Sequence, residues 1–412
     1  MNLHIREVAD KLYDYYCDDK SEKITVFVES TFQLEKCCHR NKSQSSGSLW
    51  RFGANILIEY ANGKKSGIIL DSEKLISFVG KCNAAQLRRH AIEQLPLESA
   101  NPVPVVHRAE IHDVYFSRSI SVASTEGETI HSQRSGRRCE LDILRNRVET
   151  ARRWFSESGD LDFDTLLAAA EHTLDALTEN EVVGSRRSPV LFHGATAALL
   201  FHELLGHPLE ADNYSVSKEW LKTVDEAHIN RELEFYDDPS LPGGYGSYQF
   251  DDLGFSAEIQ PLLVDGRFHV LGKPDDATSA STSQRRQDYR FPALVRASNA
   301  VIKSGSEEIE NLSSYQDGGL LHVYAVGSGR INNQNGMFEY SVPEAMWVER
   351  TGRVHSLTDV LLRGKVSELL ERIEGVANDV QEMNVTCGKK GQFIPMGARG
   401  PSVRFGALNW TC

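Results

Sequence analysis

The residues best suited to chemistry lie in one short stretch, 202–207, whose sequence is HELLGH. Its histidines, His202 and His207, offer imidazole nitrogens to a divalent metal, and Glu203 offers a carboxylate beside the first of them. These groups can hold a metal ion and activate water on it. The alternative is a buried helix end whose histidines only satisfy backbone groups, but a glutamate inside an apolar run is costly to bury without a role. The stretch therefore predicts a hydrolytic metal site.

The spacing of the histidines is one residue longer than in the common H-E-x-x-H pattern. On a regular α-helix, positions i and i+4 lie about 40° apart around the axis, whereas i and i+5 lie about 140° apart. Both imidazoles therefore reach one metal only if the backbone departs from ideal geometry. Gly206 relaxes the helix, and Pro208 disfavours the helical region for the residue before it. We expect His202 and Glu203 on the last full turn, with His207 on a distorted exit that bends back.

A catalytic zinc usually takes three protein ligands and leaves a fourth position for water. Cys387 is the most notable candidate for the third ligand, because Lys389 and Lys390 follow it and nearby cations favour the thiolate that binds metal. The alternative for Cys387 is a loop cysteine without a role. The residues alone leave these further candidates open: Glu210, Asp212, Glu226 and His228.

Several other conspicuous groups have simpler interpretations. The adjacent cysteines at 37–38, with His39 nearby, chelate poorly, so we interpret them as structural. Arg285-Arg286 is typical of a solvated surface pair, with the gripping of a peptide carboxylate as the alternative. The aspartate pairs at 237–238 and 251–252 are expected to form turns.

Composition excludes several classes of function. The chain has 412 residues, 40% of them hydrophobic and 25% charged, which is ordinary for a globular protein of two or three domains. Its net charge of −13 argues against a nucleic-acid binder. It contains no apolar run of the ~20 residues that span a bilayer, and its first residues lack the apolar core of a signal peptide. Seven cysteines at irregular spacing favour the reducing cytoplasm over a disulfide framework.

The pattern of elements predicts an α+β fold. In the N-terminal part, Asn62-Gly63 is a strong turn signal between apolar runs, and polar stretches at 40–48 and 124–138 predict loops. Beyond residue 231, short β runs with glycine-rich turns predict a barrel or curled sheet against which the helix of the HELLGH stretch packs. The expected helices are 1–18, 72–80, 83–94, 162–180, 217–228 and 358–375. The expected strands are 23–28, 49–60, 66–72, 189–192, 258–264, 267–271, 320–326, 338–341, 345–349 and 353–356. These elements predict an N-terminal α/β-type domain over residues 1–155 and a β-rich, barrel-like domain over 156–412.

The segment 189–213, which contains the HELLGH stretch, resembles the signature of the TldD/PmbA metallopeptidases, also called the modulator-of-gyrase family. The resemblance spans residues 160–405 and is weak in the first 150. Two positions, Pro208 and Leu253, depart from the family pattern. The further matches, in chain order, are Asp237-Asp238 with Leu241-Pro242-Gly243, Asp251-Asp252 with Gly254, Arg285-Arg286, Arg296 to Asn299, and the segment 387–392, CGKKGQ.

The resemblance implies a zinc peptidase with a defined set of site residues. Zinc is expected on His202, His207 and Cys387, with Glu203 as the general acid–base. It also implies an extended peptide substrate, and a heterodimer with a PmbA-like (TldE) subunit that lacks the histidine motif. Two alternatives remain open: a protease dedicated to maturing a leader or modified peptide in one biosynthetic pathway, and a non-hydrolytic regulatory or partner subunit.

Overall fold

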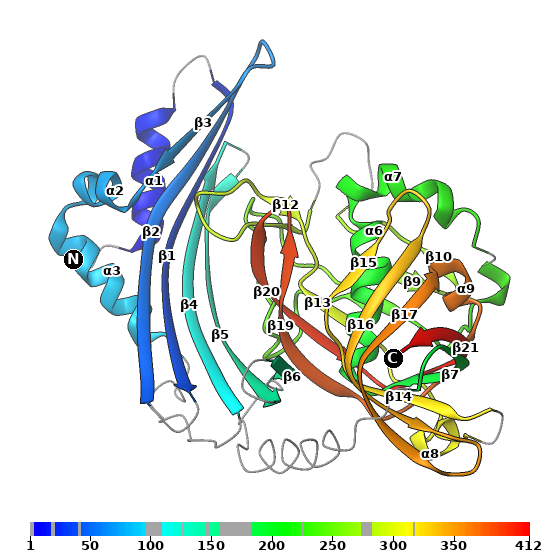
Figure 1. The fold of residues 1–412 in the computed structure, drawn as a ribbon. Coiled ribbons are helices and arrows are strands. Elements are labelled where there is room, and N and C mark those ends of the chain that lie inside the picture. The colour runs from blue at the N-terminus through cyan, green and yellow to red at the C-terminus, as the bar shows by residue number, and fades with distance from the viewer. Residues whose placement is uncertain are drawn as a thin grey trace.

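The structure is a computed structural model that describes residues 4–17, 21–39, 43–95, 109–125, 127–145, 149–155, 183–224, 226–272, 282–315 and 318–412 (Figure 1). The helix expected at 162–180 lies outside the described residues, and so do residues 156–182, where the expected second domain begins. The division into two domains therefore stays a prediction. None of the described helices is long and apolar enough to cross a membrane.

The N-terminal part is one antiparallel sheet of six strands in the order β3-β2-β1-β4-β5-β6. Three helices cover the face that points away from the C-terminal part (Figure 1). Leu12 and its apolar neighbours on the first helix pack against Val26, Phe52 and Ile56 of the sheet. The elements are α1 (Ile5–Tyr16), β1 (Ser21–His39), β2 (Ser43–Tyr60), β3 (Lys65–Leu70), α2 (Ser72–Val79), α3 (Lys81–Glu93), β4 (Ala109–Ser124), β5 (Gly127–Arg145) and β6 (Glu149–Phe155).

The expected helices of this part and the Asn62-Gly63 hairpin are confirmed, but both expected loops are wrong. Strand β2 begins at Ser43, within the predicted loop 40–48, and β5 occupies most of the stretch 124–138. Both segments are polar, yet they belong to long strands, where polar side chains are either exposed, as at 45–48, or paired with neighbours. Arg137 of β5, for example, donates to both carboxylate oxygens of Asp113 on β4, at 2.9 and 3.0 Å. The composition resembles a loop, whereas the ladder hydrogen bonds to β4 make a strand.

The C-terminal part contains a closed ring of strands, as the sequence predicts. Strands β14, β7, β21, β17 and β16 pair in succession, and β16 pairs back to β14. A second sheet, β10-β9-β8-β13-β20-β19, lies beside this ring. The strands are β7 (Arg186–Phe192), β8 (Phe235–Asp237), β9 (Gln260–Val264), β10 (Arg267–Phe268), β11 (Gln284–Arg285), β12 (Leu294–Val295), β13 (Asn299–Ile302), β14 (Leu320–Ala325), β15 (Gly329–Ile331), β16 (Met337–Val348), β17 (Val354–Lys365), β18 (Ile373–Val376), β19 (Gln381–Lys389), β20 (Gln392–Gly400) and β21 (Val403–Thr411).

Two of the expected helices in this part need correction. The helix placed at 217–228 spans Ala211–Leu221 instead, and a separate 3-10 turn follows at Glu226–His228. The helix placed at 358–375 is wrong, because β17 continues to Lys365, α9 (Val366–Leu370) is a single short helix, and β18 follows it. Strand β17 pairs with β16 along its whole length, and this pairing overrides local helix propensity. The remaining helices are α5 (Ala195–Phe201), α6 (His207–Leu209), α7 (Ala211–Leu221) and α8 (Ile309–Leu312).

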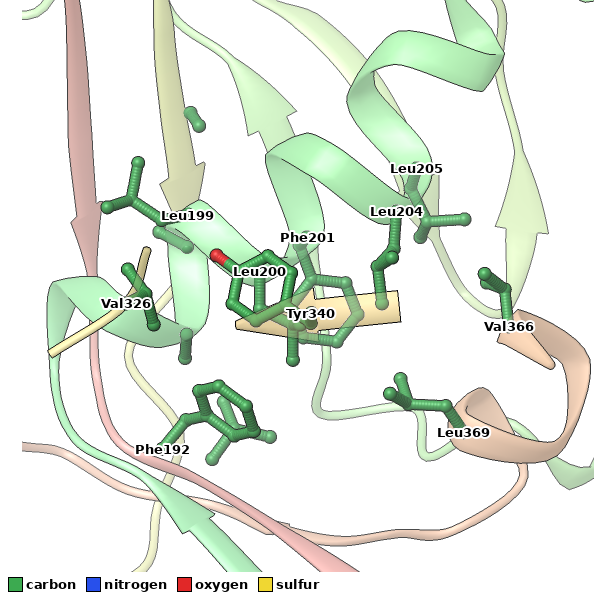
Figure 2. Packing of buried hydrophobic residues seen from close by; sticks show 14 of the residues in the cluster. Phe192, Leu199, Leu200, Phe201, Leu204, Leu205, Val326, Tyr340, Val366 and Leu369 are labelled. Atoms are coloured by element: carbon green, nitrogen blue, oxygen red, sulfur yellow. The ribbon is translucent and has the colours of Figure 1, made fainter. Parts of the chain in front are cut away.

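The helix of the HELLGH stretch is anchored in the core of the C-terminal part. All seven residues of α5 are buried. Figure 2 shows Phe201 and Leu204 of this helical segment next to Tyr340 of β16, with Phe192 of β7 below them. Because apolar side chains hold the helix on several sides, the polar residues that follow it have a fixed position and direction.

Candidate metal centre

One wide helical turn brings the two histidines together. After α5, residues His202–Gly206 form a π-helical turn, in which the N–H of His207 bonds to the carbonyl of His202. A π-turn closes its hydrogen bond over five residues, so positions i and i+5 stack along the axis as i and i+4 do in an α-helix. The ring centroids of His202 and His207 lie 4.5 Å apart. The extra residue between the two histidines is therefore accommodated within the helix by the π-turn.

The expected bend at His207 is wrong, because the departure from a regular α-helix lies before this residue, in the π-turn. His207 keeps helical angles, φ −62° and ψ −44°, and Pro208 occupies the first turn of α6, where a missing N–H is tolerated. Gly206 is also helical, with φ −52°, so it does not act through conformational freedom. Its role is spatial, because a Cβ at Gly206 would lie 3.1 Å from Nδ1 of His202.

Cys387 reaches the histidines from β19. Its Sγ lies 3.3 Å from Nε2 of His202 and 3.5 Å from Nε2 of His207. In tetrahedral coordination, sulfur at about 2.3 Å and nitrogen at about 2.0–2.1 Å from zinc lie about 3.5 Å from each other. These three ligand atoms all lie within 4.8 Å of one another. The structure thus brings together the three residues expected to bind metal, at separations that suit a tetrahedral ion.

The electrostatics of the cluster favour the thiolate form of Cys387. Burial alone would raise its pKa, but the imidazoles of His207 and His202 hold the pKa well below the usual value of a thiol. Burial likewise opposes protonation of His207, yet Cys387 and Glu210 raise the pKa of that imidazole well above its usual value. Without metal, the cluster is therefore a buried thiolate beside a proton-binding imidazole. A divalent cation can replace that proton, because metal binding requires deprotonated ligands.

A layer of charged residues orients His207. Glu210, which is fully buried, has its Oε2 3.1 Å from Nδ1 of His207. With Nδ1 donating to this carboxylate, Nε2 is directed at Cys387, as in the carboxylate–histidine pairs of metal sites. Lys389 holds the carboxylate from the other side, with Nζ 2.8 Å from Glu210 and 2.6 Å from Asp212. Glu210 therefore lies behind His207, and among the candidates for the third ligand it is Cys387 whose ligand atom lies beside both histidines.

Arg296 contacts Cys387 from behind, as Glu210 contacts His207. This guanidinium is fully buried and donates from Nη2 to the backbone carbonyl of Cys387 at 2.7 Å and to its Sγ at 3.2 Å. A cation beside the sulfur adds to the stabilisation of the thiolate. The sequence alone gives Arg296 no role, although this residue lies within one of the motifs that carry the family resemblance.

We predict that Lys389→Met destabilises the fold far more than Lys390→Met. The side chain of Lys389 is 6% exposed, and its loss leaves the buried carboxylate of Glu210 without its cation. Breaking such a pair costs about 3–5 kcal/mol. Lys390 also pairs with Asp212, at 3.0 Å, but its side chain is 58% exposed, so its loss should cost less than about 1 kcal/mol. Denaturant unfolding of both variants checks this, and equal losses would contradict it.

Glu203 lies beside the ligands and outside their set. It is half-buried on the π-turn, next to β15, where a Cβ built on Gly329 would lie 3.2 Å from the Cβ of Glu203. Burial, together with the charge of Glu203, raises the pKa of Tyr340 well above its usual value. Among the described residues, no hydrogen bond or ion pair is recorded for the Glu203 carboxylate. This position leaves it available for proton transfer, and the role stays a prediction.

Two of the other candidates lie elsewhere. Glu226 and His228 are exposed on the 3-10 turn and do not join the cluster. A second potential ligand group does occur on the N-terminal sheet, where Sγ of Cys37 lies 3.4 Å from Nδ1 of His112 and 3.6 Å from Glu35. In the sequence, Cys37 stands out only through its chain neighbours Cys38 and His39. Cys37 contacts His112 of β4, which lies opposite it in the register of β1 and β4.

Arg285 and Arg286 do not form the expected surface pair, since each is only 4% exposed. The expectation for the aspartates holds for Asp251, which accepts the backbone N–H groups of Leu253 and Phe255 in a turn. Asp252 also lies in this turn, but its carboxylate is fully buried and faces three arginines, which are Arg134, Arg118 and Arg286.

Comparisons with known proteins give relatives of the C-terminal part and of the whole fold. Residues 185–411 match the family described as the PmbA/TldA metallopeptidase C-terminal domain. The chain is 32% identical over 269 residues to the metalloprotease slr0863 of Synechocystis sp., covering 62% of this chain and 56% of that protein. It is 26% identical to a metalloprotease TldD homolog of Haemophilus influenzae (61% and 54% covered) and 25% identical to a zinc metalloprotease TldD homolog of Saccharolobus solfataricus (52% and 49%). The chain thus spans about half the length of the curated relatives it matches.

Two solved structures share the fold over nearly the whole chain. TldE from Thermococcus kodakarensis superposes with a TM-score of 0.73 at 16% identity, covering 98% of this chain and 100% of that one. A protein from Thermotoga maritima described as a putative modulator of a DNA gyrase superposes with a TM-score of 0.74 at 16% identity, covering 99% and 100%. These matches confirm the α+β fold, including its N-terminal sheet, whose sequence the family match does not reach.

Proposed function

Because the chain belongs to the TldD/PmbA metallopeptidase family, we propose that it is a zinc-dependent peptidase that hydrolyses extended or unfolded peptides. The observation that carries this proposal is the convergence of His202, His207 and Cys387, whose donor atoms have the separations of a tetrahedral zinc site. The relative from Saccharolobus solfataricus is described as a zinc metalloprotease, and a mixed nitrogen and thiolate donor set suits zinc.

In this proposal the residues of the chain divide the work of hydrolysis. Bound zinc would supply a Lewis acid that polarises the scissile carbonyl and lowers the pKa of water. Glu203 accepts the proton of the attacking water and delivers it to the leaving amine. Glu210 keeps the His207 imidazole oriented, while Arg296 stabilises the thiolate of Cys387.

The edge of the barrel sheet offers a place for an extended peptide. Strand β15 lies at the end of the strand order, and its Gly329 is adjacent to Glu203. A peptide that adds as a further strand along such an edge uses main-chain hydrogen bonds and is therefore tolerant of sequence. We propose that peptide substrates bind along β15, so that a backbone carbonyl of the substrate lies next to Glu203.

A heterodimer with a PmbA-like (TldE) subunit is part of the proposal. The likeness of the fold to a TldE structure supports it, because related folds can share the surfaces by which they pair. The test is purification with and without such a partner, followed by measurement of zinc and of the cleavage of an unfolded peptide pool by mass spectrometry. We expect one zinc per chain in the cluster and cleavage in the heterodimer. Zinc without cleavage in both preparations would favour the non-hydrolytic regulatory role.

A dedicated maturation protease is the second candidate. The family match starts at residue 185 and the match to the Synechocystis metalloprotease covers 62% of the chain, whereas the fold match to TldE covers 98% of it. An N-terminal sheet that keeps its fold but diverges in sequence favours a specialised substrate. Cleavage of one defined precursor, with no cleavage of the unfolded pool, would select this candidate.

A further inference from the structure

A cavity rich in arginine lies between the N-terminal sheet and the β19–β20 hairpin. Its volume is about 240 Å³, and it is lined on one side by β1, β2, β4 and β5 and on the other by residues of β19, β20 and the segments that precede them. Figure 1 shows the long strands of the N-terminal sheet facing β19 and β20. The described lining residues include no aspartate or glutamate. They do include five arginines: Arg51, Arg118, Arg134, Arg138 and Arg285.

The carboxylates behind the cavity are shared among these cations. Arg118 pairs with Glu29 at 2.8 Å, and Arg134 pairs with Asp252 at 3.0 Å. Asp252 also lies 3.7 Å from Arg118 and accepts the backbone N–H of Arg286. Arg138 pairs with Glu140 at 2.7 Å, and Arg51 lies 3.9 Å from Asp288. Of the five arginines that line the cavity, four thus have a carboxylate partner among the described residues, and Arg285 is the exception.

Arg285 is the clearest case of missing compensation. It donates to the backbone carbonyls of Ala297 at 2.6 Å and Pro395 at 2.8 Å, and no ion pair is recorded for it among the described residues. Burial lowers the pKa of this guanidinium to about 10. A buried charge that lacks a counter-ion is unfavourable, and a bound anion would relieve the cost.

We propose that this cavity binds a small oxyanion, a carboxylate or a phosphate, which Arg285 and the neighbouring arginines hold. Planar guanidinium groups present paired N–H donors that match the geometry of both anions. The lining also offers neutral polar groups, among them Gln33 and Thr386. The volume is below the roughly 300–1,000 Å³ typical of sites for drug-sized ligands, so it suits a small anion or the end of a chain.

This site is separate from the metal cluster, although both use the same strand. Successive side chains of a strand point to opposite faces. Thr386 lines the cavity, whereas Cys387, the next residue of β19, faces the histidines. The inference therefore goes beyond the proposed peptidase activity and does not depend on it.

The test introduces a carboxylate into the cavity with Gln33→Glu, which keeps the shape of the side chain. We expect the melting temperature of this variant without ligand to be higher than that of the unchanged protein. We also expect that added anions raise it no further, because the introduced carboxylate takes their place. The matched control is Gln334→Glu, since Gln334 is exposed in a different part of the fold and should leave both properties unchanged. A lower melting temperature in Gln33→Glu, with the anion response intact, would overturn the proposal.

The anion response is the change in melting temperature of the zinc-loaded chain when an anion is added. It is measured at constant ionic strength, set with chloride. Inorganic phosphate, succinate, and a tripeptide with a free or an amidated C-terminus are the probes. A saturable rise with phosphate or succinate identifies a free oxyanion, and a rise only with the unamidated tripeptide identifies a chain terminus. The response should persist in Cys387→Ser, because the anion does not bind the metal. No rise with any probe, or a rise that disappears in Cys387→Ser, would contradict the proposal.

Discussion

Cys387→Ser is expected to release the zinc from an otherwise folded chain. The substitution replaces the thiolate with a neutral hydroxyl, and the two imidazoles that remain make a poor site for zinc. Loss of a residue behind the ligands typically costs 10–100-fold in affinity, so loss of a ligand should exceed about 100-fold. Zinc content per chain, measured after dialysis against a weak chelator, checks this, and circular dichroism establishes that the variant is folded.

The second ligand group supplies the matched control. Cys37→Ser alters a cysteine that also lies near a histidine and a glutamate, and it should leave the zinc content unchanged. The reverse result, with zinc lost in Cys37→Ser and retained in Cys387→Ser, would move the metal to the N-terminal sheet. Stoichiometric zinc in a double variant, His202→Ala with Cys387→Ala, would rule out the proposed site altogether.

Glu203→Gln is expected to keep the zinc and to lose peptidase activity. The amide has the shape of the carboxylate but cannot accept the proton of the attacking water. General acid–base catalysis contributes about 10²–10⁴-fold, so kcat/KM should fall by that range. Stability should change little, because no ion pair or hydrogen bond of this carboxylate is recorded among the described residues. Steady-state cleavage of a fluorogenic peptide, together with zinc content, measures both effects.

The control for this variant is Glu219→Gln, which neutralises an exposed glutamate on α7. It should retain full activity. If Glu203→Gln also retains full activity, the proposed acid–base role is wrong, although the metal site stands. If it loses zinc as well, Glu203 belongs to the ligand set.

Local sequence was sufficient for the elements whose signals are short. The Asn62-Gly63 turn and the first helix follow from patterns within a few residues. The stretches 40–48 and 124–138 have the composition of loops, because a strand whose polar side chains are exposed or paired with another strand cannot be told from a loop by composition. The segment 358–375 was mistaken for a helix, because pairing of β17 with β16 decides its structure. In each case a partner distant in the chain outweighed local propensity.

The sequence by itself indicated the chemistry of the site, since His202, Glu203 and His207 lie within one short segment and their spacing already required a departure from the regular α-helix. Only the tertiary structure decided the surroundings of that site. The contact of Cys387 with His207 joins residues 180 positions apart, and that of Arg296 with Cys387 joins residues 91 apart. The tertiary structure likewise decided that Arg285 is buried, although an adjacent pair of arginines is typical of a solvated surface. Such contacts depend on how sheets pack on one another, and the energy of a buried charge depends on every group that packing brings near it.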